Sequence, residues 1–238
     1  MEKVEFSVDH RLHPKLDKYE VMSLLNKSNF TLVLGKPGSG KSSLVTSMLK
    51  NKKLLKKVYN HIFFFCPKNS RLSIKGDFWG KSLPEDQICD TLDYESLNSV
   101  YDRIRDYAEE GENSLIIFDD VQAHLKQKDV QRLFLNMVAN RRHLRLSLFL
   151  LCQNYTTIPK QVRLNLTNLF VFKVSKAQLA TIFQEQLECM HESFEEIVRN
   201  VYNEPHDFLF LDVPTQRLFY NFDNELILNE DEEENASR

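Results

Sequence analysis

One short stretch constrains the fold more than any other feature: GKPGSGKSS, residues 35–43, which holds three of the chain's six glycines. Its first eight residues fit the pattern G-x-x-x-x-G-K-S, from Gly35 to Ser42. This pattern indicates phosphate binding when it follows a buried strand and opens a helix. Here the apolar run FTLVL precedes it, and KSSLVTSMLK follows it. Both conditions hold, so the sequence predicts a phosphate-binding loop.

The residue types in this loop suit an anion. Glycine permits backbone angles and a close approach that other residues resist. The helix that follows adds the positive end of its dipole. We expect Lys41 to reach the β- and γ-phosphates of a nucleotide and Ser42 to offer its hydroxyl to Mg²⁺. The residues expected to surround the nucleotide are Gly35, Lys36, Pro37, Gly38, Ser39, Gly40, Lys41, Ser42 and Ser43. A glycine-rich turn without a ligand is the alternative, and the strand–loop–helix context argues against it.

An acidic pair, Asp119 and Asp120, ends a second apolar run, SLIIF. Neighbouring side chains on a strand point to opposite faces, so the two carboxylates can do different work. We expect Asp119 to hold Mg²⁺ through its water shell and Asp120 to polarise the attacking water. The alternative is a pair of acids that only caps the following turn.

Gln153 follows the run LSLFLLC, at a carboxyl end of a strand, where parallel α/β sheets bind their ligands. Its neutral amide is expected to hydrogen-bond the γ-phosphate or the attacking water. Asn154 is a second candidate for that role. Without the other motifs, a plain turn residue would be the preferred interpretation of Gln153.

The segment NRRHLRL, just before that strand, contains Arg141 and Arg142. An arginine near a subunit edge can reach the γ-phosphate of a neighbouring subunit and add about 10³ to 10⁵ in rate. We favour Arg142 over Arg141 for this role. A solvated helix end is the alternative, since cations favour the negative end of a helix dipole.

The apolar runs predict an α/β fold with a mainly parallel central sheet flanked by helices. They are short and do not alternate, as in strands covered on both faces. Helical stretches separate most of them, which indicates βαβ units. The runs are FTLVL (30–34), HIFFFC (61–66), SLIIF (114–118), LSLFLLC (146–152) and NLFVFKV (168–174).

After residue 174 the pattern changes to two helices, KAQLATIFQEQLE and HESFEEIVRNVYN. Two strands follow, HDFLFLDV and QRLFYNF, joined by Pro214 and Thr215. We expect these strands to form an antiparallel hairpin on the edge of the sheet.

We expect one P-loop ATPase domain over residues 30–222, a size that suits a single core. An N-terminal extension covers residues 1–29, and residues 223–238 form an acidic, disordered tail. The tail holds seven acidic residues and one basic residue, whereas the whole chain has a formal net charge of −3. The rest of the chain is therefore mildly basic.

Composition predicts a soluble intracellular protein with no membrane partner. The N-terminus, MEKVEFSVDHRLHPK, lacks the apolar stretch of a signal peptide. The longest apolar runs are too short to span a bilayer. The four cysteines have no zinc spacing, which favours a reducing compartment. Five lysines in KNKKLLKK, residues 50–57, serve either solubility or contact with nucleic-acid phosphates.

Taken together, the motifs resemble the poxvirus-type virion DNA-packaging ATPases of large DNA viruses and their relatives, a branch of the FtsK/HerA-like P-loop superfamily. The matching segments are LVLGKPGSGKSS, HIFFFCPKN, LIIFDD, NRRHLRLSLFLLCQNYTTIP and HDFLFLDVPTQRLFYNFD. They cover most of residues 30–223 in order. The phosphate loop is generic, whereas the FFFCPKN and RRHLRLSLFLLCQ blocks are more specific.

The resemblance implies a RecA/FtsK-HerA-like fold and a homo-oligomeric ring that uses ATP and Mg²⁺ to push double-stranded DNA into a preformed capsid. It implies capsid or portal vertex proteins as partners, and a place at the viral assembly site in the host cytoplasm and in the virion. It assigns Lys41 and Ser42 to the nucleotide, Asp119 and Asp120 to metal and water, Gln153 to γ-phosphate sensing, and Arg142 to catalysis in trans. Much of the wider superfamily has Glu where this chain has Asp120, which reaches one carbon less far.

Two other functions stay open. One is a nucleotide-dependent assembly switch that does not pump, and the other is a P-loop kinase of small molecules. Residues 70–90, SRLSIKGDFWGKSLPEDQICD, form a long connection with Trp79 either exposed or docked. A partner or DNA contact is the only role that the sequence suggests for this connection.

Overall fold

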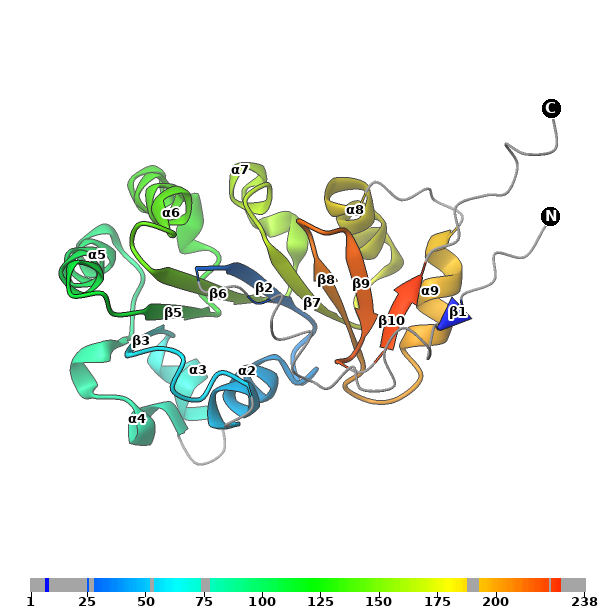
Figure 1. Cartoon of the computed structure of the whole chain (residues 1–238), viewed down its shortest axis with the longest axis horizontal. Coiled ribbons are helices and arrows are strands. Elements are labelled where there is room, and N and C mark those ends of the chain that lie inside the picture. Colours follow the sequence, from blue (N-terminus) through cyan, green and yellow to red (C-terminus); the bar gives the residue numbers. More distant parts are fainter. Residues whose placement is uncertain are drawn as a thin grey trace.

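The computed structural model describes residues 7–8, 25, 28–51, 54–73, 78–187, 193–222 and 224–227. Their strands form one sheet in the order β1-β10-β9-β8-β7-β2-β6-β5-β3-β4 (Figure 1). The strands are β1 (Ser7–Val8), β2 (Phe30–Leu34), β3 (His61–Phe65), β4 (Ile88–Cys89), β5 (Ser114–Asp119), β6 (Leu146–Cys152), β7 (Asn168–Phe172), β8 (Phe208–Asp212), β9 (Arg217–Tyr220) and β10 (Asn224–Ile227).

Helices cover both faces of this sheet, with α5, α6, α7 and α8 on one side and α2, α3 and α4 on the other (Figure 1). Within the described part of the chain, no helix is both long and apolar enough to cross a bilayer. The helices are α2 (Lys41–Lys50), α3 (Lys68–Ser73), α4 (Phe78–Ser82), α5 (Tyr94–Glu109), α6 (Lys128–Asn140), α7 (Lys160–Arg163), α8 (Lys176–Gln186) and α9 (Ser193–Val201), with short 3₁₀ turns η1 (Glu85–Gln87), η2 (His124–Lys126) and η3 (Tyr155–Thr157).

The predicted parallel sheet is confirmed. Strands β7, β2, β6, β5, β3 and β4 all pair in parallel. Every residue of β2, β5, β6 and β7 is buried, which explains why their sequences are mostly apolar and do not alternate. Two apolar clusters pack on opposite faces of the sheet, one under α5, α6 and α8 and the other under α2.

The C-terminal hairpin is also confirmed, because β8 pairs antiparallel with both β7 and β9. Its predicted place on the sheet edge is wrong, because β10 pairs with β9 and β1 pairs with β10. The expected disordered tail is therefore wrong for residues 224–227. Arg217 donates to both carboxylate oxygens of Glu225 at 2.7 and 2.8 Å, and Leu226 is buried. Residues 223 and 228–238, and most of the N-terminal extension, lie outside the described residues.

The long connection at residues 70–90 is docked on the sheet. Trp79 is 1% exposed and stacks on Phe64 of β3, with the ring centroids 4.5 Å apart. Arg103 of α5 donates to the backbone oxygen and the carboxylate of Asp86, which ties η1 to α5. The connection is thus held in place at several points along its described length.

Replacing Trp79 by alanine should lower the free energy of unfolding by about 3–5 kcal/mol, since it removes a large buried ring. Urea denaturation followed by circular dichroism measures this change. Leu164→Ala is the control, because Leu164 is 60% exposed and should change stability by no more than about 0.5 kcal/mol. Equal losses for the two variants would show that Trp79 does not pack in the core in solution.

Candidate functional site

The glycine-rich loop lies between β2 and α2, at the carboxyl edge of the parallel strands. Its first residue is fixed to the neighbouring strand, because the backbone N–H of Gly35 donates to the carbonyl of Cys152 at 3.1 Å. A Cβ atom on Gly35 would lie 2.4 Å from Ser39 Oγ and 2.8 Å from the Cβ of Phe172. Gly40 has a φ of 108°, in the left-handed region that favours glycine. Gly38 also lies in this region, with a φ of 76°, so the loop needs glycine once for space and twice for backbone angle.

Lys41 folds back over the loop. Its ammonium donates to the carbonyl of Gly35 at 2.8 Å and to that of Lys36 at 3.0 Å. Partial burial lowers the pKa of Lys41, and the nearby Asp119 carboxylate opposes that shift. These two bonds use two of the three donors of the ammonium group and hold it over the loop backbone.

Ser42 and Asp119 are brought together from opposite parts of the chain. The hydroxyl of Ser42 donates to Asp119 Oδ2 at 2.8 Å. Asp119 is only 9% exposed, and this burial raises the pKa of its carboxyl, against the opposing effects of the Ser42 hydrogen bond and the Lys41 charge.

A hydroxyl and a carboxylate oxygen are hard donors that fit Mg²⁺. The described residues contain no group of three or more His, Cys, Asp or Glu side chains that could hold a metal ion. Mg²⁺ at Ser42 and Asp119 would therefore need phosphate and water oxygens to complete its shell, as it commonly does in nucleotide sites.

Asp120 has a different environment from Asp119. It is exposed and has a φ of 59°, in the left-handed region that few non-glycine residues adopt. The hydroxyl of Ser70, on α3, donates to Asp120 Oδ2 at 3.2 Å. Sequence reasoning missed Ser70, because only the pairing of β3 with β5 brings these two segments together.

Gln153 and Asn154 follow β6, next to the strand residue that binds Gly35. Gln153 is exposed at this edge of the sheet. Asn154 is occupied as a turn cap, because its side-chain oxygen accepts from the backbone N–H of Thr156 at 3.0 Å and from the Thr156 hydroxyl at 2.9 Å. Gln153 is therefore the better placed of the two for a ligand at the loop.

The two arginines after α6 differ in their contacts. Arg141 donates to the carbonyls of Ser28 and Val138 at 3.0 and 2.8 Å, which gives it a structural role. Arg142 is exposed in the turn that precedes β6. That turn lies at the amino end of β6, and the length of this strand separates it from the phosphate loop by about 20 Å. Arg142 therefore cannot reach the loop of its own subunit.

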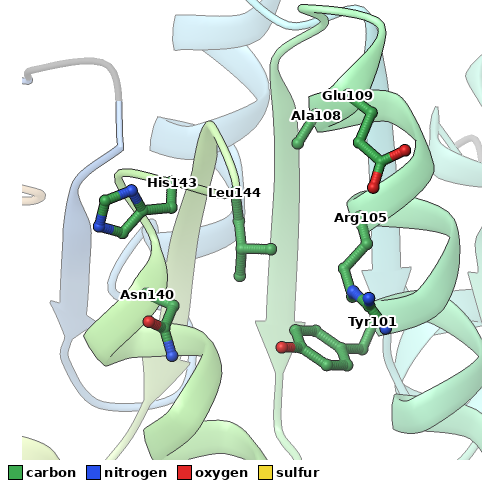
Figure 2. Close-up of a pocket in the computed structure, with 7 residues that line it drawn as sticks. All are labelled: Tyr101, Arg105, Ala108, Glu109, Asn140, His143 and Leu144. Atoms are coloured by element: carbon green, nitrogen blue, oxygen red, sulfur yellow. The ribbon is translucent and has the colours of Figure 1, made fainter.

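A separate cavity of about 410 Å³ lies near Arg142, away from the phosphate loop. Figure 2 shows Asn140, His143 and Leu144 on one side of it and α5 on the other. Its lining residues are Tyr101, Arg105, Ala108, Glu109, Asn140, His143 and Leu144. The predicted nucleotide residues do not line this cavity, so it is not the candidate site.

His206 is a further residue that sequence reasoning missed. Its Nδ1 lies 2.9 Å from the carbonyl oxygen of Ser39, within the phosphate loop. The contact joins segments 167 residues apart in sequence. No local pattern indicates it, because it depends on β8 pairing with β7, which in turn pairs with β2.

Comparisons with known proteins agree with this arrangement. The family model described as "Poxvirus A32 protein" matches residues 17–201. DNA packaging protein OPG160 of variola virus and that of vaccinia virus (strain Copenhagen) are each 32% identical over 157 residues, which is 63% of this chain and 56% of the relative. The match thus spans little more than half the length of these curated relatives.

Solved structures resemble the fold. The genome packaging NTPase B204 from Sulfolobus turreted icosahedral virus 2, in complex with ATP-gammaS, has a TM-score of 0.63 and 18% identity, over 82% of this chain and 97% of that chain. EssC (ATPases 2 and 3) from Geobacillus thermodenitrificans has a TM-score of 0.52 and 12% identity, over 87% of this chain and 42% of that chain. At these identities the likeness concerns the fold, an α/β sheet of the kind found in P-loop packaging ATPases.

Asp119→Asn should make the isolated chain more stable at pH 7 in the absence of Mg²⁺ and nucleotide. Burial raises the pKa of Asp119 in the folded state, so its stabilising effect is present while it is protonated and is lost as the pH rises through that pKa. The asparagine side chain stays neutral throughout. The stability difference should therefore shrink as the pH falls through the raised pKa of Asp119, and it should be lost below the ordinary aspartate value of 3.8.

Urea denaturation of both proteins across this pH range measures the difference. Asp106→Asn, at an exposed position on α5, is the control and should change stability by no more than about 0.5 kcal/mol. An Asp119→Asn protein that is less stable than the wild type at pH 7 would contradict the expected cost of the buried carboxylate.

Proposed function

The chain belongs to the Poxvirus A32 protein family, and on that premise we propose that it is an ATP-hydrolysing motor that translocates double-stranded viral DNA into a preformed capsid. The observation that carries the proposal is the 2.8 Å contact between Ser42 Oγ and Asp119 Oδ2. It joins the helix that opens at the phosphate loop to the acidic end of β5. A shared phosphate and metal site needs this juxtaposition.

In the proposed reaction, backbone N–H groups of the loop bind the triphosphate and Lys41 neutralises its β- and γ-oxygens. Ser42 and Asp119 would hold Mg²⁺, which neutralises developing charge on the phosphates when it is bound. Asp120 orients a water molecule and accepts its proton as the water oxygen bonds to the γ-phosphorus. The bond from that phosphorus to the bridging oxygen breaks, and ADP leaves. Gln153 hydrogen-bonds the γ-phosphate or the water.

Arg142 completes the site of a neighbouring subunit in this proposal. It lies at the opposite edge of the sheet from its own loop and is exposed. Its guanidinium can therefore approach the nucleotide of a neighbouring subunit, but not the nucleotide of its own subunit. This arrangement requires a head-to-tail homo-oligomer, and head-to-tail contacts that close form a ring. In such a ring, hydrolysis depends on contact between subunits.

The proposed partners are double-stranded DNA and the capsid or portal vertex proteins, at the assembly site in the host cytoplasm. Support comes from the relatives named DNA packaging protein. The ATP-gammaS complex of the B204 fold relative supports ATP as the nucleotide. A kinase is less well supported, because Arg217, one of the few arginines after β7, is paired with Glu225. A nucleotide-dependent assembly switch has the same site and is separated from a motor only by its response to DNA.

Steady-state hydrolysis of ATP by the wild-type chain should rise when long double-stranded DNA is added. Asp120→Asn should lower kcat by about 10²- to 10⁴-fold, the usual contribution of a group that accepts a proton in the transition state. Its affinity for ATP should stay within a few fold of the wild type, because in the proposed reaction Asp120 contacts the attacking water and not the phosphates. A slow wild-type rate that DNA does not change would exclude the motor for the isolated chain and favour the switch.

Arg142→Ala should lower kcat by about 10³-fold or more if the guanidinium acts on the γ-phosphate. Mixing this variant with Lys41→Ala should restore part of the activity, since the loop of one subunit and the arginine of the other form a complete site. Arg132→Ala, an exposed arginine on α6, is the control and should leave kcat unchanged. Absence of recovery in the mixture, with assembly intact, would mean that Arg142 does not act in trans.

A further inference from the structure

The turn that leads into β8 contacts the phosphate loop through His206. The Nδ1 atom of this histidine lies 2.9 Å from the carbonyl oxygen of Ser39. A carbonyl oxygen accepts hydrogen bonds and does not donate them, so Nδ1 is the donor. The C-terminal hairpin therefore supplies a hydrogen bond to the backbone of the loop.

This bond constrains the next amide along the loop. The peptide unit between Ser39 and Gly40 is planar, and none of the described peptide bonds is cis. In a trans peptide the C=O and N–H groups point in opposite directions. With the Ser39 carbonyl held towards His206, the N–H of Gly40 is turned away from the histidine. An amide fixed in this way does not need to be reoriented when an anion arrives.

His206 is exposed, but its ring and Phe172 both lie close to Gly40. A Cβ atom on Gly40 would lie 3.2 Å from His206 Nδ1 and 3.4 Å from the ring of Phe172. The histidine ring and the end of β7 thus both contact the loop at Gly40. A side chain at this position would have to displace one of them.

His206 is itself held by the hairpin. It has a φ of 72°, in the left-handed region. The carboxylate of Asp207 accepts from the backbone N–H of Glu204 at 2.7 Å and from Asn221 Nδ2 at 3.1 Å. Asn221, just after β9, also accepts from the N–H of Phe208 through its side-chain oxygen at 3.0 Å. These bonds tie the His206 turn to Asn221, which lies beside Phe208 at the open end of the hairpin.

We propose that His206 is a positioning residue for nucleotide binding, which holds the Ser39–Gly40 peptide so that the Gly40 N–H is presented to the β-phosphate. The inference rests on the proposed function, because it takes a nucleoside di- or triphosphate as the ligand. It adds a residue from the C-terminal hairpin, outside residues 17–201, to the phosphate site. The shape of the phosphate loop then depends on a segment that its own motif does not include.

Two substitutions separate the hydrogen bond from backbone strain. His206→Gly adopts the left-handed φ without strain but has no side-chain donor. His206→Asn tolerates the same φ, and its Nδ2 is attached where the Nδ1 of histidine is attached. Glycine should therefore weaken ATP binding by roughly 3- to 10-fold, the effect of one hydrogen bond, while asparagine should restore it to nearly the wild-type value.

The measurement is isothermal titration of the full chain with ATP, ADP and AMP, together with KM and kcat for ATP hydrolysis. His206→Gly should weaken ATP and ADP by the same factor, leave AMP unchanged because it lacks a β-phosphate, and raise KM with little change in kcat. Thermal unfolding midpoints without nucleotide should differ by no more than about 5 °C between the glycine and asparagine variants, the effect of one hydrogen bond and of the flexibility of glycine in the unfolded chain. This agreement would distinguish loop positioning from a general loss of structure.

Wild-type affinity of His206→Gly for ATP would overturn the inference, as would an asparagine variant as weak as the glycine variant. A loss of AMP binding equal to that of ATP would overturn it too. The proposed motor fails by a different result: tight ATP binding by the wild type without DNA-dependent hydrolysis. In that case the nucleotide titrations would still decide the role of His206.

Discussion

Parallel pairing of β2, β6 and β5 is the constraint on which the rest of the structure depends. Leu34 pairs with Cys152, and Leu151 pairs with Asp119, so the three strands end at the same edge of the sheet. The phosphate loop, Gln153 and the acidic pair follow directly from these ends. A change of register by one residue would turn the buried side chains of these strands to the wrong face and would separate Ser42 from Asp119. The geometry of the site is therefore a consequence of strand pairing.

The same strand pairing places two ionisable side chains, Lys41 and Asp119, in positions where burial disfavours their charged forms. Burial raises the pKa of Asp119 and lowers the pKa of Lys41, so both ionised side chains are less favourable here than in water. The Ser42 hydroxyl and the loop carbonyls offset part of this cost. A ligand that brings phosphate and a divalent cation would supply the missing partners. Burial of Lys41 and Asp119 thus costs the fold some stability.

Much of the fold could be predicted from the sequence, because buried parallel strands leave continuous apolar runs and the phosphate loop has a strong local pattern. This reasoning predicts the strand at 30–34, whereas the hairpin after residue 207 is predicted from two apolar runs joined by Pro214 and Thr215. The strand at 224–227 was missed, since a short apolar stretch stood next to a run of acids that indicated a disordered tail. The sequence does not indicate the docking of Trp79 on Phe64, because a lone tryptophan in a polar segment has no periodicity to interpret.

By itself the sequence determined the α/β class, the phosphate loop, the acidic pair and Gln153, because each depends on residues that are close together in the chain. Tertiary structure decided which of these side chains meet. It joined Ser42 to Asp119 and Ser70 to Asp120, and it assigned Arg141 to a structural role and left Arg142 exposed. It also brought His206 to Ser39 across 167 residues. These contacts depend on strand order and on backbone angles such as the left-handed φ of His206, and neither leaves a local pattern in the sequence.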